Sequence, residues 1–318
     1  MATAYSIAWD VPLHDWNTFR LDARARCLAT VQDAAALPAL LTETALRDLT
    51  VMVLGAGSNV LFATERFDGC LVHLQCQQAR IIGNDGEHAI VHVDAGFEWD
   101  ALVDWTLARG LQGLENLALI PGQAGAAPIQ NIGAYGVEVA THIAAVHVYD
   151  QHTGRFDCLS AGQCGFGYRD SVFKREPDRR IVTAIELRLP TTGATNLSYA
   201  GLAEELFAMG ELAATPRNVA AAVRRIRRRK LPDPAVMGNA GSFFKNPVVA
   251  RTVALELQSR FDGMPVFPAA TDFDRKLSAA WLIEHAGWRG FRNVDAAVSS
   301  QHALLLLKRG RASGPQLL

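Results

Sequence analysis

Residues 113–138 read GLENLALIPGQAGAAPIQNIGAYGVE, and this stretch decides how the fold is interpreted. It is rich in glycine, alanine and proline and has no helical or strand period, yet it is far too apolar for a solvated linker. An irregular segment of this length inside a compact domain is usually functional. Small residues such as Gly122 and Gly125 expose the main chain, so a flat and rigid ligand can lie against it, while Gln130 and Asn131 offer amide groups of both polarities. The alternative is a buried loop packed for its own sake.

The segments on either side of this stretch alternate between predicted strands and predicted helices, which indicates an α+β fold. On the N-terminal side we expect a helix that starts at Asp33 as N-cap and a buried strand that runs into Gly55. On the C-terminal side we expect two strands joined by a turn within 144–159 and a further strand that ends at Pro190. The other expected elements are strands over 69–75, 80–83, 88–96 and 302–310 and helices over 98–109, 216–231, 251–261 and 276–287.

The composition is that of an ordinary globular protein, with 318 residues, 49% hydrophobic residues and 20% charged residues. The formal net charge of −1 gives no global attraction to nucleic acids or anionic membranes, so we predict neither as a partner. The 5 cysteines are scattered and never spaced as C-x-x-C, which argues against a disulfide framework and a structural zinc site, and we predict no metal ion. Since no charged leader and no apolar run of membrane-spanning length is found, we expect a cytoplasmic protein. We also expect it to be a monomer.

A second glycine-containing segment, VLGAGSNVLF at residues 53–62, follows the expected buried strand. Gly55 and Gly57 allow a tight turn whose backbone N–H groups, up to Ser58 and Asn59, can point at a phosphate. Plain turn chemistry is the alternative, because the segment fits neither G-x-x-x-x-G-K-[ST] nor G-x-G-x-x-G.

A third segment, CGFGYRDSVFK at residues 164–174, alternates polar and aromatic residues. Arg169 can hold a carboxylate through two parallel hydrogen bonds, and the alternative is a surface pair between Arg169 and Asp170. Further along, the arginines of a basic run over 224–230 are expected to form a solvated helix face. Lys230 differs, because it precedes the rigid LPDP turn, which can direct its side chain toward a diphosphate.

The segment AGSFFKNP at residues 240–247 contains Ser242 without the features of a nucleophilic serine. A nucleophilic serine normally has a base such as histidine within reach and often lies in G-x-S-x-G, and this segment offers neither. The residues alone leave Ser242 open to interpretation as a proton donor or as a turn residue.

Taken in order, these segments resemble the UDP-N-acetylenolpyruvoylglucosamine reductases, a family of bacterial flavoenzymes in peptidoglycan-precursor synthesis. The resemblance runs from about Asn17 to the last residue, and it also includes NTF at 17–19, LPDP at 231–234 and KLSAAWLIEHAG at 276–287. The stretch 113–138 and the serine segment are highly specific together. LSYAGL at 197–202 is similar to the subclass that closes a tyrosine-bearing loop over the substrate.

The resemblance implies an α+β fold in which an FAD-binding unit of the vanillyl-alcohol-oxidase (PCMH) type precedes a smaller α+β substrate-binding domain. This FAD-binding unit is expected over about 17–190. We expect two FAD-binding subdomains over 1–75 and 76–195, a tyrosine loop with a connecting helix over 196–232, and the substrate domain over 233–318. The residues expected to bind FAD are Gly55, Gly57, Ser58, Asn59, Pro121, Gly122, Gly125, Ala126, Gln130, Asn131 and Gly133.

The resemblance also implies a reaction with small-molecule substrates. NADPH reduces the flavin, leaves, and is replaced by UDP-N-acetylglucosamine enolpyruvate, which is reduced to UDP-N-acetylmuramate. In this reaction Ser242 is expected to donate the proton, and Arg169 is expected to hold the substrate carboxylate. The residues expected to position the sugar nucleotide are Tyr168, Tyr199, Lys230 and Asn246.

One departure from the family concerns the C-terminal segment KRGRASGPQLL. Members of the family carry a catalytic glutamate after a further helix and strand, whereas here Ser313 and Pro315 only begin a helix. We therefore expect a shortened chain that lacks this glutamate. An alternative to the active reductase is thus a protein that binds FAD and nucleotide sugar but turns over feebly. A sugar or aldehyde oxidase on the same flavin fold is a further alternative, against which the Ser242 and Arg169 segments argue.

Overall fold

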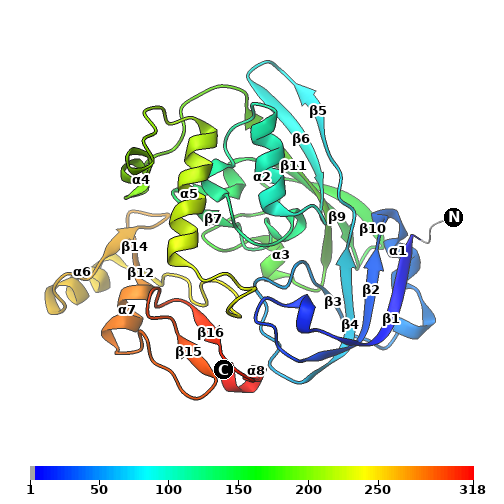
Figure 1. Ribbon diagram of the computed structural model, residues 1–318. Coiled ribbons are helices and arrows are strands. Elements are labelled where there is room, and N and C mark those ends of the chain that lie inside the picture. The colour runs from blue at the N-terminus through cyan, green and yellow to red at the C-terminus, as the bar shows by residue number, and fades with distance from the viewer. Residues whose placement is uncertain (1–3) are drawn as a thin grey trace. The chain divides into compact units, whose positions relative to one another are not determined.

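The computed structural model describes residues 4–318, and within it the chain divides into two compact units (Figure 1). The first unit contains residues 4–12, Arg24–Gly57 and Arg66–Arg229. The second unit contains Leu13–Ala23, Ser58–Glu65 and Lys230–Leu318. The mixed content of helices and strands in both units confirms the predicted α+β class. The predicted boundaries at 75/76 and 195/196 stay predictions.

The N-terminal part of the first unit contains a four-stranded sheet in the order β1-β2-β4-β3. Its strands are β1 (Tyr5–Pro12), β2 (Arg24–Val31), β3 (Val51–Val53) and β4 (Arg66–Leu74). Strand β2 is antiparallel to β1 and parallel to β4, and β3 is parallel to β4. The strand expected to be buried before Gly55 is instead the short edge strand β3, whose Val53 is 43% exposed. An edge strand has only one neighbour, which explains why its side chains are partly exposed.

The helix expected after Asp33 is broken into short pieces. These pieces are the 3-10 turns η2 (Ala34–Ala36) and η3 (Thr44–Leu46) and the five-residue helix α1 (Leu37–Leu41). The capping role of Asp33 is confirmed, because its Oδ1 accepts a hydrogen bond from the backbone N–H of Ala35 at 2.9 Å. The helix ends where the hydroxyl of Thr42 donates to the carbonyls of Pro38 and Ala39, which is a side-chain alternative to continued helix.

The larger part of the first unit is built on a five-stranded antiparallel sheet in the order β10-β9-β11-β6-β5. Its strands are β5 (Ala79–Asn84), β6 (His88–Asp94), β9 (Ile143–Asp150), β10 (Arg155–Ser160) and β11 (Arg180–Pro190). One face of this sheet carries apolar residues such as Val91, Val146 and Ile185, which belong to the main hydrophobic core. The alternate residues of the same strands lie on the opposite face, as the two-residue period of a strand requires.

Three helices contribute to the main core on that apolar face: α2 (Trp99–Ala108), α4 (Leu202–Ala208) and α5 (Pro216–Lys230). Helices α2 and α5 lie side by side in front of the sheet (Figure 1), and Arg224 of α5 forms ion pairs with Asp100 and Asp104 of α2. Between β6 and β9 the chain contains mostly turns: η4 (Glu115–Leu117), η5 (Ala124–Ala126), β7 (Gly133–Ala134), β8 (Val137–Glu138) and η6 (Val139–Thr141). The short helix α3 (Val172–Arg175) precedes β11.

The second unit has two small sheets. Strands β12 (Val248–Ala250), β14 (Asp274–Leu277) and β13 (Val266–Pro268) pair antiparallel in that order, with helices α6 (Arg251–Arg260) and α7 (Ala279–His285). Strands β15 (Ala296–Val298) and β16 (Leu306–Lys308) form a two-stranded ladder. The unit also contains the 3-10 turn η1 (His14–Trp16) and the terminal helix α8 (Gly314–Leu317). Among residues 4–318, no helix has both the length and the apolar character needed to cross a membrane.

Candidate functional site

The irregular stretch 113–138 is fixed to the turn after β6 by backbone hydrogen bonds. The N–H of Ala124 donates to the carbonyl of Phe97 at 2.8 Å, and the N–H of Gly125 donates to the carbonyl of Ala95 at 2.9 Å. A Cβ atom at Gly125 would lie 2.5 Å from the Cβ of Ala95. This approach is closer than any side chain allows, so Gly125 is needed for the loop to lie where it does.

The same part of the first unit contains backbone strain. Leu119, Asn131, Tyr135 and Arg169 have φ angles of 59°, 48°, 49° and 54°, which lie in the left-handed region that residues other than glycine rarely adopt. Three of these residues belong to the stretch 113–138, and the fourth lies against it. Strained residues of this kind occur preferentially at functional sites, where the surrounding structure holds them in place.

Asn131 is the buried centre of the loop. Its side-chain Nδ2 donates to Glu138 Oε2 at 2.8 Å and to the carbonyl of Gly167 at 3.0 Å, and its Oδ1 accepts from the N–H of Ala140 at 3.0 Å. The side chain of Asn131 therefore connects the loop to the segment that carries Arg169. Because these bonds occupy its amide group, Asn131 positions the loop.

Arg169 packs its guanidinium against the main chain of the loop. Nη1 donates to the carbonyl of Asn131 at 3.2 Å, and Nη2 donates to the carbonyl of Gly133 at 2.5 Å. The alternative interpretation of Arg169 as one half of a surface pair is wrong, because Asp170 forms its ion pair with Arg175. Arg169 is thus held by neutral acceptors, which leave its positive charge uncompensated by these contacts.

The predicted substrate residues Tyr168 and Tyr199 both lie in the first unit. Tyr168 places its ring 5.5 Å from the Arg169 guanidinium. Tyr199 is 39% exposed and packs edge-on against Tyr135 of the loop, with 4.8 Å between the ring centroids. The structure therefore brings Tyr168 and Arg169 together and places Tyr199 beside the same loop.

Only part of the arginine run of α5 forms the expected solvated face, because Arg225, Arg228 and Arg229 are exposed whereas Arg224 and Arg227 are partly buried. Arg225 and Arg229 form ion pairs with the buried Glu205, at 2.8 and 2.7 Å. The Nε of Arg227 donates to the carbonyl of Leu119 at 3.2 Å, and burial lowers the pKa of Arg227. The expectation failed for Arg224 and Arg227 because their acceptors, Asp100 and the carbonyl of Leu119, come from segments that are distant in the sequence.

The glycine turn after β3 lies next to the stretch 113–138. A Cβ at Gly55 would be 3.3 Å from Gln123 Oε1 and 3.8 Å from the Cβ of Ala126, so the two segments expected to bind FAD are neighbours in the first unit. Gly57 has a φ angle of 62°. Among the residues that the structure describes, no acceptor is found for the backbone N–H groups of Gly55, Ala56 and Gly122. Unpaired N–H groups in a glycine turn fit a pyrophosphate, and the residues present therefore fit FAD.

Two family models match this chain. A model described as FAD binding domain matches residues 25–157, and the model of the UDP-N-acetylenolpyruvoylglucosamine reductase C-terminal domain matches residues 233–318. The chain is 49% identical, over 316 residues, to the UDP-N-acetylenolpyruvoylglucosamine reductase of Xanthomonas axonopodis pv. citri (strain 306). That alignment covers 99% of this chain and 90% of the relative.

The chain belongs to the UDP-N-acetylenolpyruvoylglucosamine reductase family. A second relative of the same name, from Xylella fastidiosa (strain M12), is 48% identical. That alignment covers 97% of this chain and 88% of the relative. The crystal structure of UDP-N-acetylenolpyruvylglucosamine reductase (MurB) from Thermus caldophilus superposes with a TM-score of 0.68 at 26% identity. The superposition covers 98% of this chain and 91% of the Thermus caldophilus chain.

As a member of the UDP-N-acetylenolpyruvoylglucosamine reductase family with an FAD binding domain, the chain is a flavin-dependent oxidoreductase. This confirms the resemblance, the fold class and the FAD cofactor that the sequence implied. The individual residue roles stay predictions.

The remaining predicted residues of this family member lie in the second unit. Ser242 is exposed and follows Gly241, which has a φ angle of 69°. The segment is held to the chain before β16, because the N–H of Phe243 donates to the carbonyl of Leu304 at 2.9 Å. Asn246 Oδ1 accepts from the N–H of Ala279 at 3.0 Å and so supports the start of α7. The other predicted residues of this unit are Ser58, Asn59 and the exposed Lys230 at the end of α5.

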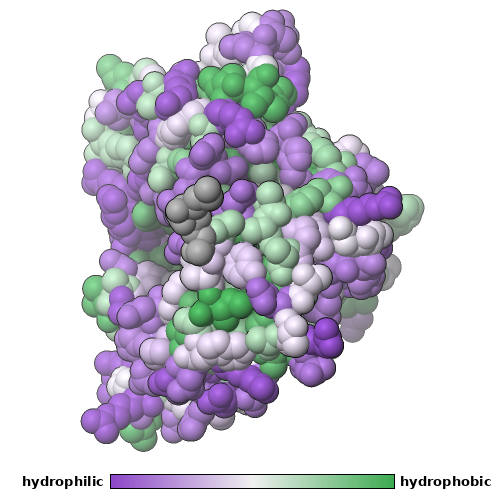
Figure 2. All heavy atoms as spheres, turned by 90° about the vertical axis from the view of Figure 1, so that its right-hand side faces the viewer, coloured by the Kyte–Doolittle hydropathy of each residue, from purple (hydrophilic) through white to green (hydrophobic). Residues whose placement is uncertain are grey.

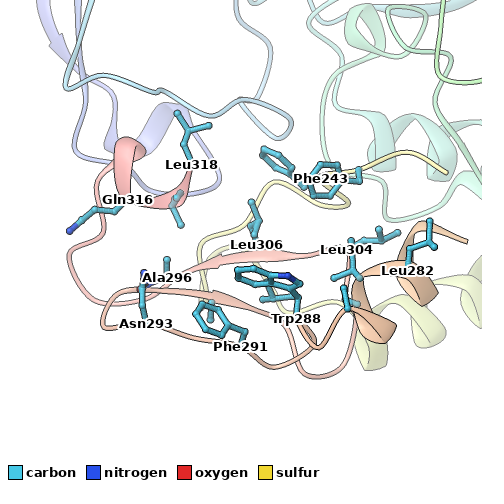
Figure 3. A pocket seen from close by; sticks show the side chains of 17 residues that line it. Phe243, Leu282, Trp288, Phe291, Asn293, Ala296, Leu304, Leu306, Gln316 and Leu318 are labelled. Carbon is cyan, nitrogen blue, oxygen red and sulfur yellow. The ribbon is translucent and has the colours of Figure 1, made fainter. Parts of the chain in front are cut away.

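The second unit also contains a pocket of about 640 Å³ (Figure 3). Phe243 and Phe244, which follow Ser242, contribute to its wall together with Trp288 and Phe291. Its lining is almost entirely apolar and includes no ionisable side chain. The pocket is therefore unsuited to proton transfer by its own residues.

The residue-by-residue prediction did not include three side chains that the structure places around Arg169 and the tyrosines. Glu138 accepts from Asn131, Tyr135 packs against Tyr199, and Arg227 reaches the carbonyl of Leu119. Burial raises the pKa of Tyr135, and the positive charge of Arg227 opposes that effect. A bulky tyrosine within a run of small residues was the sequence signal that could have identified Tyr135.

Proposed function

We propose that this chain reduces UDP-N-acetylglucosamine enolpyruvate to UDP-N-acetylmuramate, a step in the synthesis of the peptidoglycan precursor. The observation that carries the proposal is the strained Arg169, which rests on the carbonyls of Asn131 and Gly133 in a chain that is 49% identical to a named reductase. FAD, when bound, would supply the hydride-transfer chemistry between NADPH and the enolpyruvyl group. The other steps depend on residues of this chain.

Arg169 holds the carboxylate of the enolpyruvyl group. A guanidinium has five N–H donors, and the two contacts to the loop carbonyls leave donors for a carboxylate. As negative charge develops on the carbon next to the carboxylate, a cation that is already in place stabilises it without reorganisation. The hydrogen bonds to the loop thus fix the guanidinium of Arg169 in position before the negative charge develops.

Ser242 gives its proton to the carbon that becomes negative. Among residues 4–318, no hydrogen-bond partner is found for its hydroxyl, as expected for a group that needs no base to activate it. A serine that releases a proton to a strongly basic carbanion differs from a serine that must first become an alkoxide. Ser242 can therefore act as a proton donor although its segment contains no histidine.

The residues that position the sugar nucleotide are Tyr168, Tyr199, Lys230 and Asn246. FAD is held by the glycine turn and by the stretch 113–138, with the backbone N–H groups of Gly55 and Gly122 available to its phosphates. The full set of residues is Gly55, Gly57, Ser58, Asn59, Pro121, Gly122, Gly125, Ala126, Gln130, Asn131 and Gly133. We further propose that the protein acts as a cytoplasmic monomer on small-molecule substrates.

Replacement of Ser242 by alanine tests the proton-donor role. In Ser242→Ala we expect flavin reduction by NADPH to stay close to the wild-type rate, while reoxidation by the enolpyruvyl substrate slows by roughly a hundredfold or more. Anaerobic stopped-flow absorbance measures the two half-reactions separately. Ser259→Ala is the control, since its hydroxyl only caps the carbonyl of Glu256 in the same unit. Equal losses in both half-reactions of Ser242→Ala would remove the proton donor from the proposal.

A further inference from the structure

Polar side chains form a row across the five-stranded sheet, on the face opposite the main core. His92 of β6 is paired in register with Glu186 of β11, and Cys158 of β10 is paired with His147 of β9. The neighbouring residues in these strands, such as Val91 and Val146, point into the core. Figure 2 views the molecule from the side of Figure 1 on which these strands lie and shows a mainly hydrophilic surface with separate hydrophobic patches.

The side chains of this row approach one another closely. His147 Nε2 lies 2.7 Å from Glu186 Oε1, and His92 Nδ1 lies 3.9 Å from the same oxygen. Cys158 Sγ lies 3.9 Å from His147 Nε2. The ligand atoms of His92, His147 and Glu186 all lie within 4.8 Å of one another.

These separations suit a tetrahedral metal ion. Bonds of about 2.0 Å to nitrogen or oxygen and about 2.3 Å to sulfur place neighbouring zinc ligands roughly 3.3 to 3.6 Å apart. The two distances of 3.9 Å are slightly longer and the distance of 2.7 Å is shorter than these values, so small shifts of the side chains are needed to admit an ion. Two imidazoles, a carboxylate and a thiol form a donor set of the kind that zinc accepts.

We propose that His92, His147, Glu186 and Cys158 form a binding site for Zn²⁺. The sequence predicted no metal ion because it lacks closely spaced ligands, whereas this site takes one ligand from each of four adjacent strands. The ion would therefore join β6, β11, β9 and β10 and stabilise the first unit.

A second carboxylate supports His92 as a ligand. Asp94 Oδ1 lies 3.6 Å from His92 Nε2, the ring nitrogen that faces away from Glu186, and Asp94 Oδ2 is fixed by the N–H of Gln78 at 2.9 Å. A histidine that contacts a carboxylate through one nitrogen and a metal through the other is the usual arrangement around zinc.

Cys158 and Arg80 affect how tightly zinc binds. Zinc binds the thiolate form of a cysteine, so its binding to Cys158 releases the thiol proton. Arg80 is paired in register with His92 and places a positive charge near the ion. Both effects weaken binding.

The test uses tag-free, flavin-bound protein from which metal has been removed with a chelator. Zn²⁺ is titrated by isothermal calorimetry into the wild type and into variants His147→Ala and Glu186→Gln, the second of which keeps the side-chain shape. His152→Ala is the control, because it removes a histidine of the exposed β9–β10 turn outside the cluster. X-ray absorption at the zinc edge then identifies the ligand atoms in the wild type and in Cys158→Ser.

We expect one Zn²⁺ per wild-type chain and an unchanged affinity in His152→Ala. Both ligand variants should lose affinity by at least roughly tenfold to a hundredfold, the range seen when even a supporting partner of a ligand is removed. A zinc–sulfur distance of about 2.3 Å should be present in the wild type and absent in Cys158→Ser. Failure of the wild type to bind Zn²⁺, equal binding by all variants, or zinc without a sulfur ligand would overturn the proposed site.

Discussion

At the residue scale, the site depends on the close approach of the Arg169 guanidinium to Gly133, which has no side chain. A Cβ at Gly133 would lie 2.9 Å from Arg169 Nη1 and 3.0 Å from the carbonyl of Val137. A Cβ at Gly133 would also lie 2.9 Å from Cγ of Glu138, and the backbone carbonyl is fixed by the short β7–β8 ladder, so the side chains of Arg169 and Glu138 are the groups that must move. The absence of a side chain at Gly133 thus leaves room for the guanidinium.

Gly133→Ala should therefore impair the reaction with substrate. We expect reoxidation of the reduced flavin by the enolpyruvyl substrate to slow by roughly tenfold to a hundredfold, because a small displacement of a positioning group costs this much. Flavin content, measured by absorbance, corrects for any loss of cofactor. Gly162→Ala is the matched control, since its Cβ would meet nothing closer than 4.0 Å. Wild-type reoxidation in Gly133→Ala would mean that the position of Arg169 does not limit the reaction.

The sequence was sufficient to propose individual site residues but not to predict their contacts. Arg169 and Asn131 could be proposed from a specific motif, whereas the bonds between them join residues that are 38 positions apart. The alternative pairing of Arg169 with Asp170 failed for the same reason, because adjacency in sequence does not set side-chain direction. Positive φ angles at residues other than glycine leave no clear signature in the sequence.

At the scale of elements, helix α5 holds α4 in place. Glu205 of α4 has a side chain that is 6% exposed and accepts ion pairs from Arg225 and Arg229 of α5. Helix α4 begins at Leu202, whose N–H donates to the carbonyl of Tyr199 at 3.2 Å. The contact between the helices therefore also fixes the segment that carries Tyr199.

Glu205→Gln should destabilise the protein in a pH-dependent manner. The hydrogen bond from Arg229 lowers the pKa of Glu205 below its ordinary value of 4.5, so the stabilisation is present above that value and is lost as pH falls through the lower, folded-state pKa. Because both arginine side chains are more than half exposed, the expected loss at neutral pH is about 1 kcal/mol. Urea unfolding of the wild type and the variant measures the difference in unfolding free energy.

The matched control for this helix contact is Glu204→Gln, which changes an exposed neighbour on the same helix. It should leave stability unchanged at every pH. A difference between Glu205→Gln and the wild type that persists at acid pH would show that the lost charge is not its cause.

Local pattern predicted most elements of the first unit, because a strand such as β6 alternates strictly and α2 has clear helical spacing. Local pattern failed where the length of an element or its contacts with distant segments decide the structure. The helix after Asp33 is interrupted, β3 is only an edge strand, and the arginines of α5 find partners such as Asp100 that lie more than a hundred residues away. No local window contains that information.

At the scale of the whole molecule, the chain combines an FAD binding domain with the C-terminal domain of the reductase family. Its net charge of −1 provides no general attraction for anionic substrates, so we expect local groups, such as Arg169 and backbone N–H groups, to recognise NADPH and the sugar nucleotide. The family and fold could be predicted from ordered motifs along the chain, whereas the predicted residue roles await kinetics.

The most direct test of the central claim is anaerobic stopped-flow absorbance of the 318-residue chain with its bound flavin, mixed first with NADPH and then with UDP-N-acetylglucosamine enolpyruvate. UDP-N-acetylglucosamine, which lacks the enolpyruvyl group, is the control ligand. We predict bleaching of the flavin by NADPH, followed by rapid recovery with the enolpyruvyl substrate and none with the control ligand. Bleaching without substrate-dependent recovery would contradict the proposed reaction and would leave a protein that binds its cofactor without completing the reduction.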